Sequence, residues 1–179
     1  MKEMANKALR LGIIGAVAAL MLAVVNNFTE PVIRELKAAE LQAALTVLAS
    51  GRTTGEAESA PAPGVVQRWP IGSDEGWILE LEAVGYGGSM TVVASYDARG
   101  AVNVARLMDN SETVGFGKKA EDPEYMEIFV DTGGDSPVPT DKSALGPDAD
   151  VVSGATVTFS GISEALQKGS ELVKSWEEQ

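Results

Sequence analysis

Six consecutive residues near the C-terminal end of the chain, 153–158, combine hydroxyl side chains with small ones. The hydroxyls of Ser153, Thr156 and Thr158 can hydrogen-bond the oxygens of an anion, while Gly154 and Ala155 let a ligand approach the backbone closely. A helical pattern follows directly, so the N–H groups of its first turn point toward the same place. These residue types alone predict an anion cradle that contains hydroxyl nucleophiles.

A Ser-Gly-Ala-Thr run is also typical of an ordinary loop that caps a helix. The complete string Ser-Gly-Ala-Thr-Val-Thr over 153–158, however, resembles the flavinylation motif of the FMN-binding domain family. The resemblance implies that Thr158 carries FMN through a phosphoester bond. It also implies that Ser153, Gly154, Ala155 and Thr156 surround the bound cofactor.

Two further segments stand in the order expected of this family. Residues 112–117, Glu-Thr-Val-Gly-Phe-Gly, resemble the E-T-P-G-L-G signature, with Val114 in place of Pro and Phe116 in place of Leu. Residues 85–88, Gly-Tyr-Gly-Gly, resemble the family's G-Y-G-G turn. The resemblance implies that Phe116 contacts the flavin ring. The further cofactor-binding residues that it implies are Tyr86, Glu112, Thr113, Gly115, Gly117 and Lys118.

Composition limits the chemistry that the chain can do unaided. The 179 residues include no Cys and no His, which removes thiol catalysis, iron–sulfur ligation and imidazole general-base chemistry. Redox work therefore needs an imported cofactor. The net charge of −12 argues against nucleic-acid binding, because phosphate backbones need basic surfaces. Acidic residues between 135 and 150 lack the spacing of a calcium loop, so we expect no metal site.

An uncharged apolar stretch over 11–25 predicts a membrane helix that flanking residues extend to about the length of a bilayer span. A cleaved signal peptide is the alternative, but no clear cleavage site follows. Lys2, Lys7 and Arg10 precede the stretch, so we expect the N-terminus to stay in the cytoplasm. The sequence thus predicts a single-pass protein of the cell (inner) membrane, with its main domain outside the cytoplasm.

Periodicity changes along the rest of the chain. We expect a membrane anchor over 1–28, an amphipathic helix and linker over 29–64, and an FMN-binding domain over 65–179. Strand-like patterns at 77–84, 90–96 and 102–108 predict an antiparallel meander, and residues 132–150 are mainly typical of turns. A short helix at Pro123 and an amphipathic helix after the cradle complete an α+β fold with helices packed on the sheet.

The resemblance implies a function for the whole chain. Members of the family include the G subunit of the Rnf ion-translocating ferredoxin:NAD oxidoreductase, which the chain resembles most, and the C subunit of the sodium-pumping NADH:quinone oxidoreductase. We therefore expect an electron-transfer subunit with covalent FMN, whose partners are other membrane subunits of an Rnf-like complex, membrane lipid and a flavin transferase that attaches the cofactor from FAD. The alternatives are a stand-alone flavinylated module outside the cytoplasm and a non-redox protein that binds a phosphate ligand.

Overall fold

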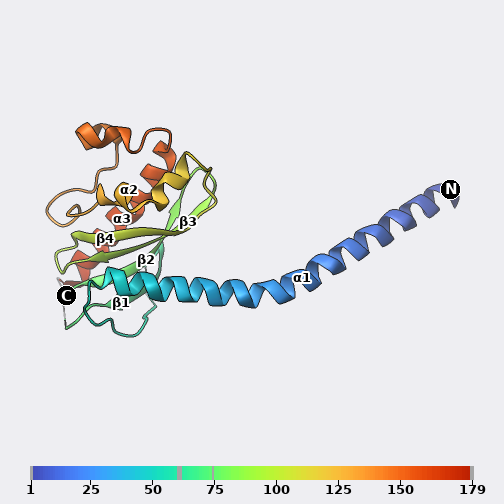
Figure 1. Ribbon diagram of the computed structural model, residues 1–179, viewed down its shortest axis with the longest axis horizontal. Helices are drawn as coiled ribbons and strands as arrows, with labels where there is room; N and C mark the ends of the chain where they lie inside the picture. The colour runs from blue at the N-terminus through green and yellow to red at the C-terminus, as the bar shows by residue number, and fades with distance from the viewer. Residues whose placement is uncertain (1, 60–61, 74, 178–179) are drawn as a thin grey trace. The chain divides into compact units, whose positions relative to one another are not determined.

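The computed structural model describes residues 2–59, 62–73 and 75–177 of the chain, which divide into two compact units at residues 42 and 43 (Figure 1). The first unit consists of most of helix α1 (Lys2–Leu48). Pro31 lies inside this helix, so the predicted anchor and the predicted amphipathic helix form one continuous element. Proline has no backbone N–H and cannot donate to the carbonyl one turn earlier, yet the helix continues through this position.

Helix α1 is long and apolar enough to cross a membrane, and no residue of its most apolar part is buried. A signal sequence would pass the same test of length and composition. The last turns of α1 contain buried residues, unlike the rest of the helix. Ala44, Leu45 and Leu48 belong to the second compact unit, which begins at Ala43.

The second unit is built on a four-stranded antiparallel sheet in the order β1-β2-β3-β4. Its strands are β1 (Val65–Pro70), β2 (Trp77–Val84), β3 (Ser89–Tyr96) and β4 (Val102–Asp109). The three predicted strands are confirmed. Strand β1 was not predicted, because it is short, carries polar residues and ends in Pro70, which an edge strand tolerates.

Residues 52–59 run beside strand β1. Thr54 forms an isolated bridge with Ile71, and Glu58 forms one with Arg68 on β1. The Glu58 carboxylate also accepts a hydrogen bond from the Arg68 guanidinium at 2.9 Å. This part of the predicted linker is therefore fixed along the outer edge of the sheet.

Four helical segments follow the sheet: η1 (Gly117–Glu121), α2 (Pro123–Glu127), η2 (Lys142–Asp150) and α3 (Thr156–Glu177). Asp122 caps α2 by accepting a hydrogen bond from the Glu124 N–H. Residues 142–150, for which turns were expected, form a 3-10 helix that is interrupted at Gly146.

Helix α3 packs on strands β2 and β3 (Figure 1). The apolar stripe predicted for this helix is buried against alternate residues of the strands, and Phe159 at its start stacks on Phe129. The main core members are Leu79, Leu81, Val92, Ala94, Phe129, Phe159, Ile162, Ala165, Leu166 and Val173. The predicted α+β class is confirmed. Because α3 packs on the sheet, its first turn has a fixed position relative to the strands.

Candidate functional site

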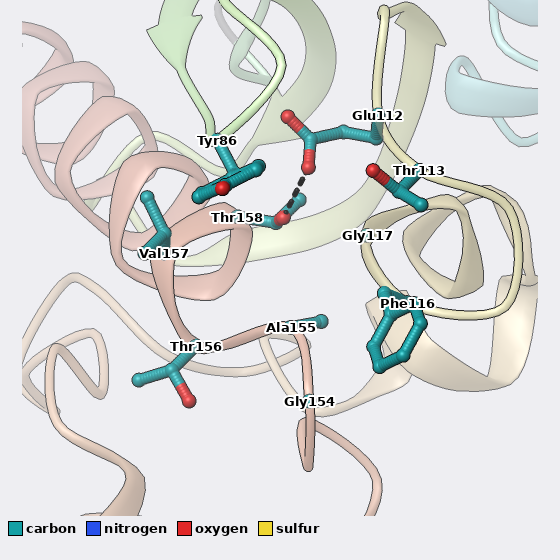
Figure 2. A pocket seen from close by; sticks show the side chains of 10 residues that line it. All are labelled: Tyr86, Glu112, Thr113, Phe116, Gly117, Gly154, Ala155, Thr156, Val157 and Thr158. Carbon is teal, nitrogen blue, oxygen red and sulfur yellow. Dashed lines mark hydrogen bonds between the residues drawn. The ribbon is translucent and has the colours of Figure 1, made fainter.

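A cavity of about 450 Å³ lies where three segments distant in sequence meet (Figure 2). The turn between β2 and β3 supplies Tyr86, the loop after β4 supplies Glu112, Thr113, Phe116 and Gly117, and the start of α3 supplies 154–158. The three motifs found in the sequence therefore line one cavity. Its volume falls within the range of pockets that bind small organic molecules.

Local backbone geometry brings Thr158 to this cavity. Gly154 has a φ of +80°, a left-handed conformation that favours glycine, and the chain enters α3 two residues later at Thr156. Thr158 consequently lies in the first turn of the helix, where backbone N–H groups lack carbonyl partners within the helix. This arrangement gives the cavity a concentration of positive dipole ends, as an anion site requires.

The Thr158 hydroxyl donates a hydrogen bond of 2.7 Å to the carboxylate of Glu112 (Figure 2). Both side chains are buried, with 1% of Thr158 and 5% of Glu112 exposed. The second carboxylate oxygen accepts a hydrogen bond of 2.8 Å from the Gly87 N–H. Glu112 is therefore held by one donor from each of the other two motifs.

Glycines surround this carboxylate because nothing larger fits. A Cβ atom on Gly85 would overlap the oxygen that faces Gly87, and a Cβ atom on Gly117 would overlap the oxygen that faces Thr158. The Gly117 Cβ would also stand 2.7 Å from the Thr158 hydroxyl oxygen. Gly85 and Gly117, one from each upstream motif, thus let the backbone close around the Glu112–Thr158 pair.

Tyr125 of α2 lies close enough to this pair for the charge of Glu112 to act on it. Its side chain is 2% exposed, and its hydroxyl has no hydrogen-bond partner among the described residues. Burial raises the pKa of the Tyr125 phenol, and the charge of Glu112 raises it further. The phenol therefore stays protonated at neutral pH. No local pattern in the sequence could have placed it beside Glu112.

The rim of the cavity is apolar and open. Phe116 is 56% exposed and Tyr86 is 79% exposed, so neither is a core residue. The Phe116 ring lies against Gly154, where an added Cβ would come within 3.1 Å of a ring carbon. Thr156 is exposed and points away from the Thr158 hydroxyl (Figure 2).

Three of the predicted site residues lie outside the cavity lining: Ser153, Gly115 and Lys118. The Lys118 ammonium group forms an ion pair with Glu121 at 3.0 Å. The Ser153 carbonyl and hydroxyl oxygens accept hydrogen bonds of 3.4 Å from Lys119 and Lys142, respectively. These two lysines were not predicted, and they bring positive charge next to the cradle. A role in cofactor binding stays a prediction for the three residues.

The residues present fit an FMN molecule. The first turn of α3 and its hydroxyls suit a phosphate group, and the small residues at 154–155 leave space that a side chain would fill. The exposed rings of Phe116 and Tyr86 offer an apolar surface of the kind that a flavin ring covers. Among the described residues, no cluster of three or more acidic groups is arranged to hold a metal ion.

Comparisons with known proteins agree with this geometry. Residues 85–171 match the FMN-binding domain family, which defines the class of protein to which the fold and the cavity correspond. Residues 1–48 match the RnfG N-terminal region. A relative from Cereibacter sphaeroides, the G subunit of an ion-translocating oxidoreductase complex, is 30% identical over 92% of this chain and 81% of its own length. A protein of the same name from Methanosarcina acetivorans is 26% identical over 98% of this chain and 97% of its own length.

The chain belongs to the family formed by the G subunits of ion-translocating oxidoreductase complexes. The family resemblance stated from the three motifs is therefore confirmed. The match over 1–48 also covers the whole of helix α1, so the resemblance extends to the membrane element as well as to the FMN-binding domain.

Proposed function

We propose that this protein is a membrane-anchored electron-transfer subunit of an Rnf-like ion-translocating oxidoreductase complex, and that it carries FMN on Thr158 through a phosphoester bond. The observation that carries the proposal is the meeting of three family motifs at one cavity whose buried hydroxyl belongs to Thr158. The names of the relatives and the match over 1–48 support membership of a multi-subunit complex.

Within this proposal each part of the cavity has a task. Thr158 supplies the attachment oxygen, and the first turn of α3 stabilises the phosphate charge. Phe116 and Tyr86 contact the isoalloxazine ring and exclude water from one side of it. The bound flavin supplies the one- or two-electron chemistry, while the protein sets its orientation, exposure and local field.

The covalent bond itself is tested on the full-length protein made in cells that contain a flavin transferase. We expect the acid-precipitated and washed protein to stay yellow, with a flavin absorbance spectrum, and we expect peptide mass mapping to place the FMN increment on Thr158. A colourless precipitate with no mass increment would contradict covalent attachment and favour the phosphate-binding alternative. Failure to co-purify with other membrane subunits would favour a stand-alone flavinylated module.

We further propose that α1 is a retained single-pass anchor and that the FMN-binding domain lies outside the cytoplasm. The division into an anchor over 1–28, a helix and linker over 29–64 and a domain over 65–179 belongs to this proposal. Its support is the apolar character of α1 together with the basic residues before the apolar stretch. The proposed partners are membrane lipid, the other subunits of the complex and the transferase.

Membrane orientation can be measured with single cysteines because the natural chain has none. Asn6 precedes the apolar stretch, Ala57 follows α1, and both are exposed. In spheroplasts we expect a membrane-impermeant maleimide to label the Ala57→Cys variant and not the Asn6→Cys variant, which should react only after the membrane is permeabilised. Labelling of Asn6→Cys alone would show the opposite orientation.

A further inference from the structure

We infer that Glu112 is the general base for the attachment of FMN to Thr158, so that the acceptor protein contributes a catalytic residue to its own modification. The inference rests on the proposed phosphoester at Thr158 and goes beyond it by assigning the proton acceptor. Its basis is the hydrogen bond of 2.7 Å in which the Thr158 hydroxyl already directs its proton to the Glu112 carboxylate. Glu112 thus touches the reacting oxygen.

A carboxylate at this position is costly for a purely structural role. Glu112 is 5% exposed, and the ion pairs formed by the described residues do not include it. Its hydrogen-bond donors are neutral groups, the Gly87 N–H and the Thr158 hydroxyl. Carboxylates are seldom buried without an opposite charge, and one that accepts a hydrogen bond from a hydroxyl at a cavity has the geometry of a general base.

The Thr158 hydroxyl bonds differently from the buried Ser163 hydroxyl of the same helix. Ser163 lies on the same helix, is also buried, and donates its hydroxyl proton at 2.8 Å to the Phe159 carbonyl one turn earlier. Thr158 instead donates across 46 positions of sequence to a carboxylate, which leaves its oxygen lone pairs for an electrophile in the cavity.

The proposed step balances as a phosphoryl transfer from FAD bound to the transferase. The Thr158 oxygen attacks the phosphorus of the FMN half, and a new O–P bond forms. The pyrophosphate P–O bond breaks, AMP leaves, and the hydroxyl proton passes to Glu112. The product places a phosphodiester anion beside a neutral carboxylic acid, which can donate a hydrogen bond to it, so two negative charges do not face each other.

The test measures the initial rate of FMN attachment to the purified full-length protein, made without transferase and then mixed with transferase, FAD and Mg²⁺. Intact mass is followed with time. We expect Glu112→Gln to lower this rate at least about 100-fold, since general-base contributions are typically 10² to 10⁴. The matched change Glu124→Gln, at an exposed acid of α2, should stay within about twofold of the natural protein.

Chemical rescue separates a base from a structural support. Glu112→Ala leaves a space that formate can enter, so we expect added formate to raise its slow rate about tenfold or more, whereas Glu112→Gln fills the space and should not respond. Thermal melting identifies any variant that fails to fold. In that case Glu112→Asp, which keeps a carboxylate, replaces it, and we expect its attachment rate to lie between those of the natural protein and Glu112→Gln.

Glu112→Gln attachment within about threefold of the natural rate would overturn the inference, and so would a folded Glu112→Ala protein that formate does not rescue. Both results leave the phosphoester itself standing if the natural protein gains FMN on Thr158. A natural protein that gains no mass would instead refute the proposed attachment, and this inference with it.

Discussion

The Thr158→Ala protein should carry no flavin that survives denaturation, even when made beside an active transferase. The expected loss is complete because alanine has no oxygen to form the O–P bond, and the other hydroxyls of the motif are placed differently. Denaturing gels under ultraviolet light should show no fluorescent band at the mass of the chain, and intact-mass spectra should show only the unmodified protein.

Thr156→Ala is the matched control for this change. Thr156 is two residues away on the same helix, is exposed and points away from the Thr158 hydroxyl (Figure 2), so its loss should reduce attachment at Thr158 far less than the loss of Thr158 itself. The Thr158→Ala protein should remain folded but lose about 1.5 to 3 kcal/mol of unfolding free energy, because a buried carboxylate loses a hydrogen bond. A fluorescent band that persists in Thr158→Ala would mean that another residue carries the FMN.

Gly117→Ala should reduce attachment strongly although it removes no chemical group. The added methyl would overlap the Glu112 carboxylate and stand 2.7 Å from the Thr158 hydroxyl oxygen, so the hydrogen bond between them must break or lengthen. Overpacking of this kind typically costs about 1 to 3 kcal/mol. We expect the attachment rate to fall at least about tenfold, because the general-base contact is displaced while the carboxylate itself remains. Thermal unfolding should shift to lower temperature.

Gly115→Ala separates this effect from general strain in the same loop. Gly115 has a φ of +81°, so alanine is strained there by about 1 to 2 kcal/mol, but an added Cβ meets no atom within 4 Å. Its stability should fall while attachment stays close to the natural rate. Equal attachment by the Gly117→Ala and Gly115→Ala proteins would contradict the view that close packing around Glu112 matters for the reaction.

Several features of this protein follow from the sequence alone, because they depend on short-range patterns. The apolar run in α1, the strands β2 to β4, the Asp122 cap and the stripe of α3 are all visible as periodicity or as local capping chemistry. The motif strings also identified the family and most of the residues that line the cavity. Composition alone required that any redox chemistry be borrowed from a cofactor.

Only the tertiary structure shows which site residues contact one another. The resemblance implied that Gly117 binds the cofactor, and the fold shows in addition that Gly85 and Gly117 make room for the Glu112 carboxylate. Neither the bond from Thr158 to Glu112 nor the burial of Tyr125 beside it can be read from a local pattern. These contacts arise where β2, the loop after β4 and α3 meet, and only the packing of the sheet against α3 sets the distances between side chains so far apart in the chain.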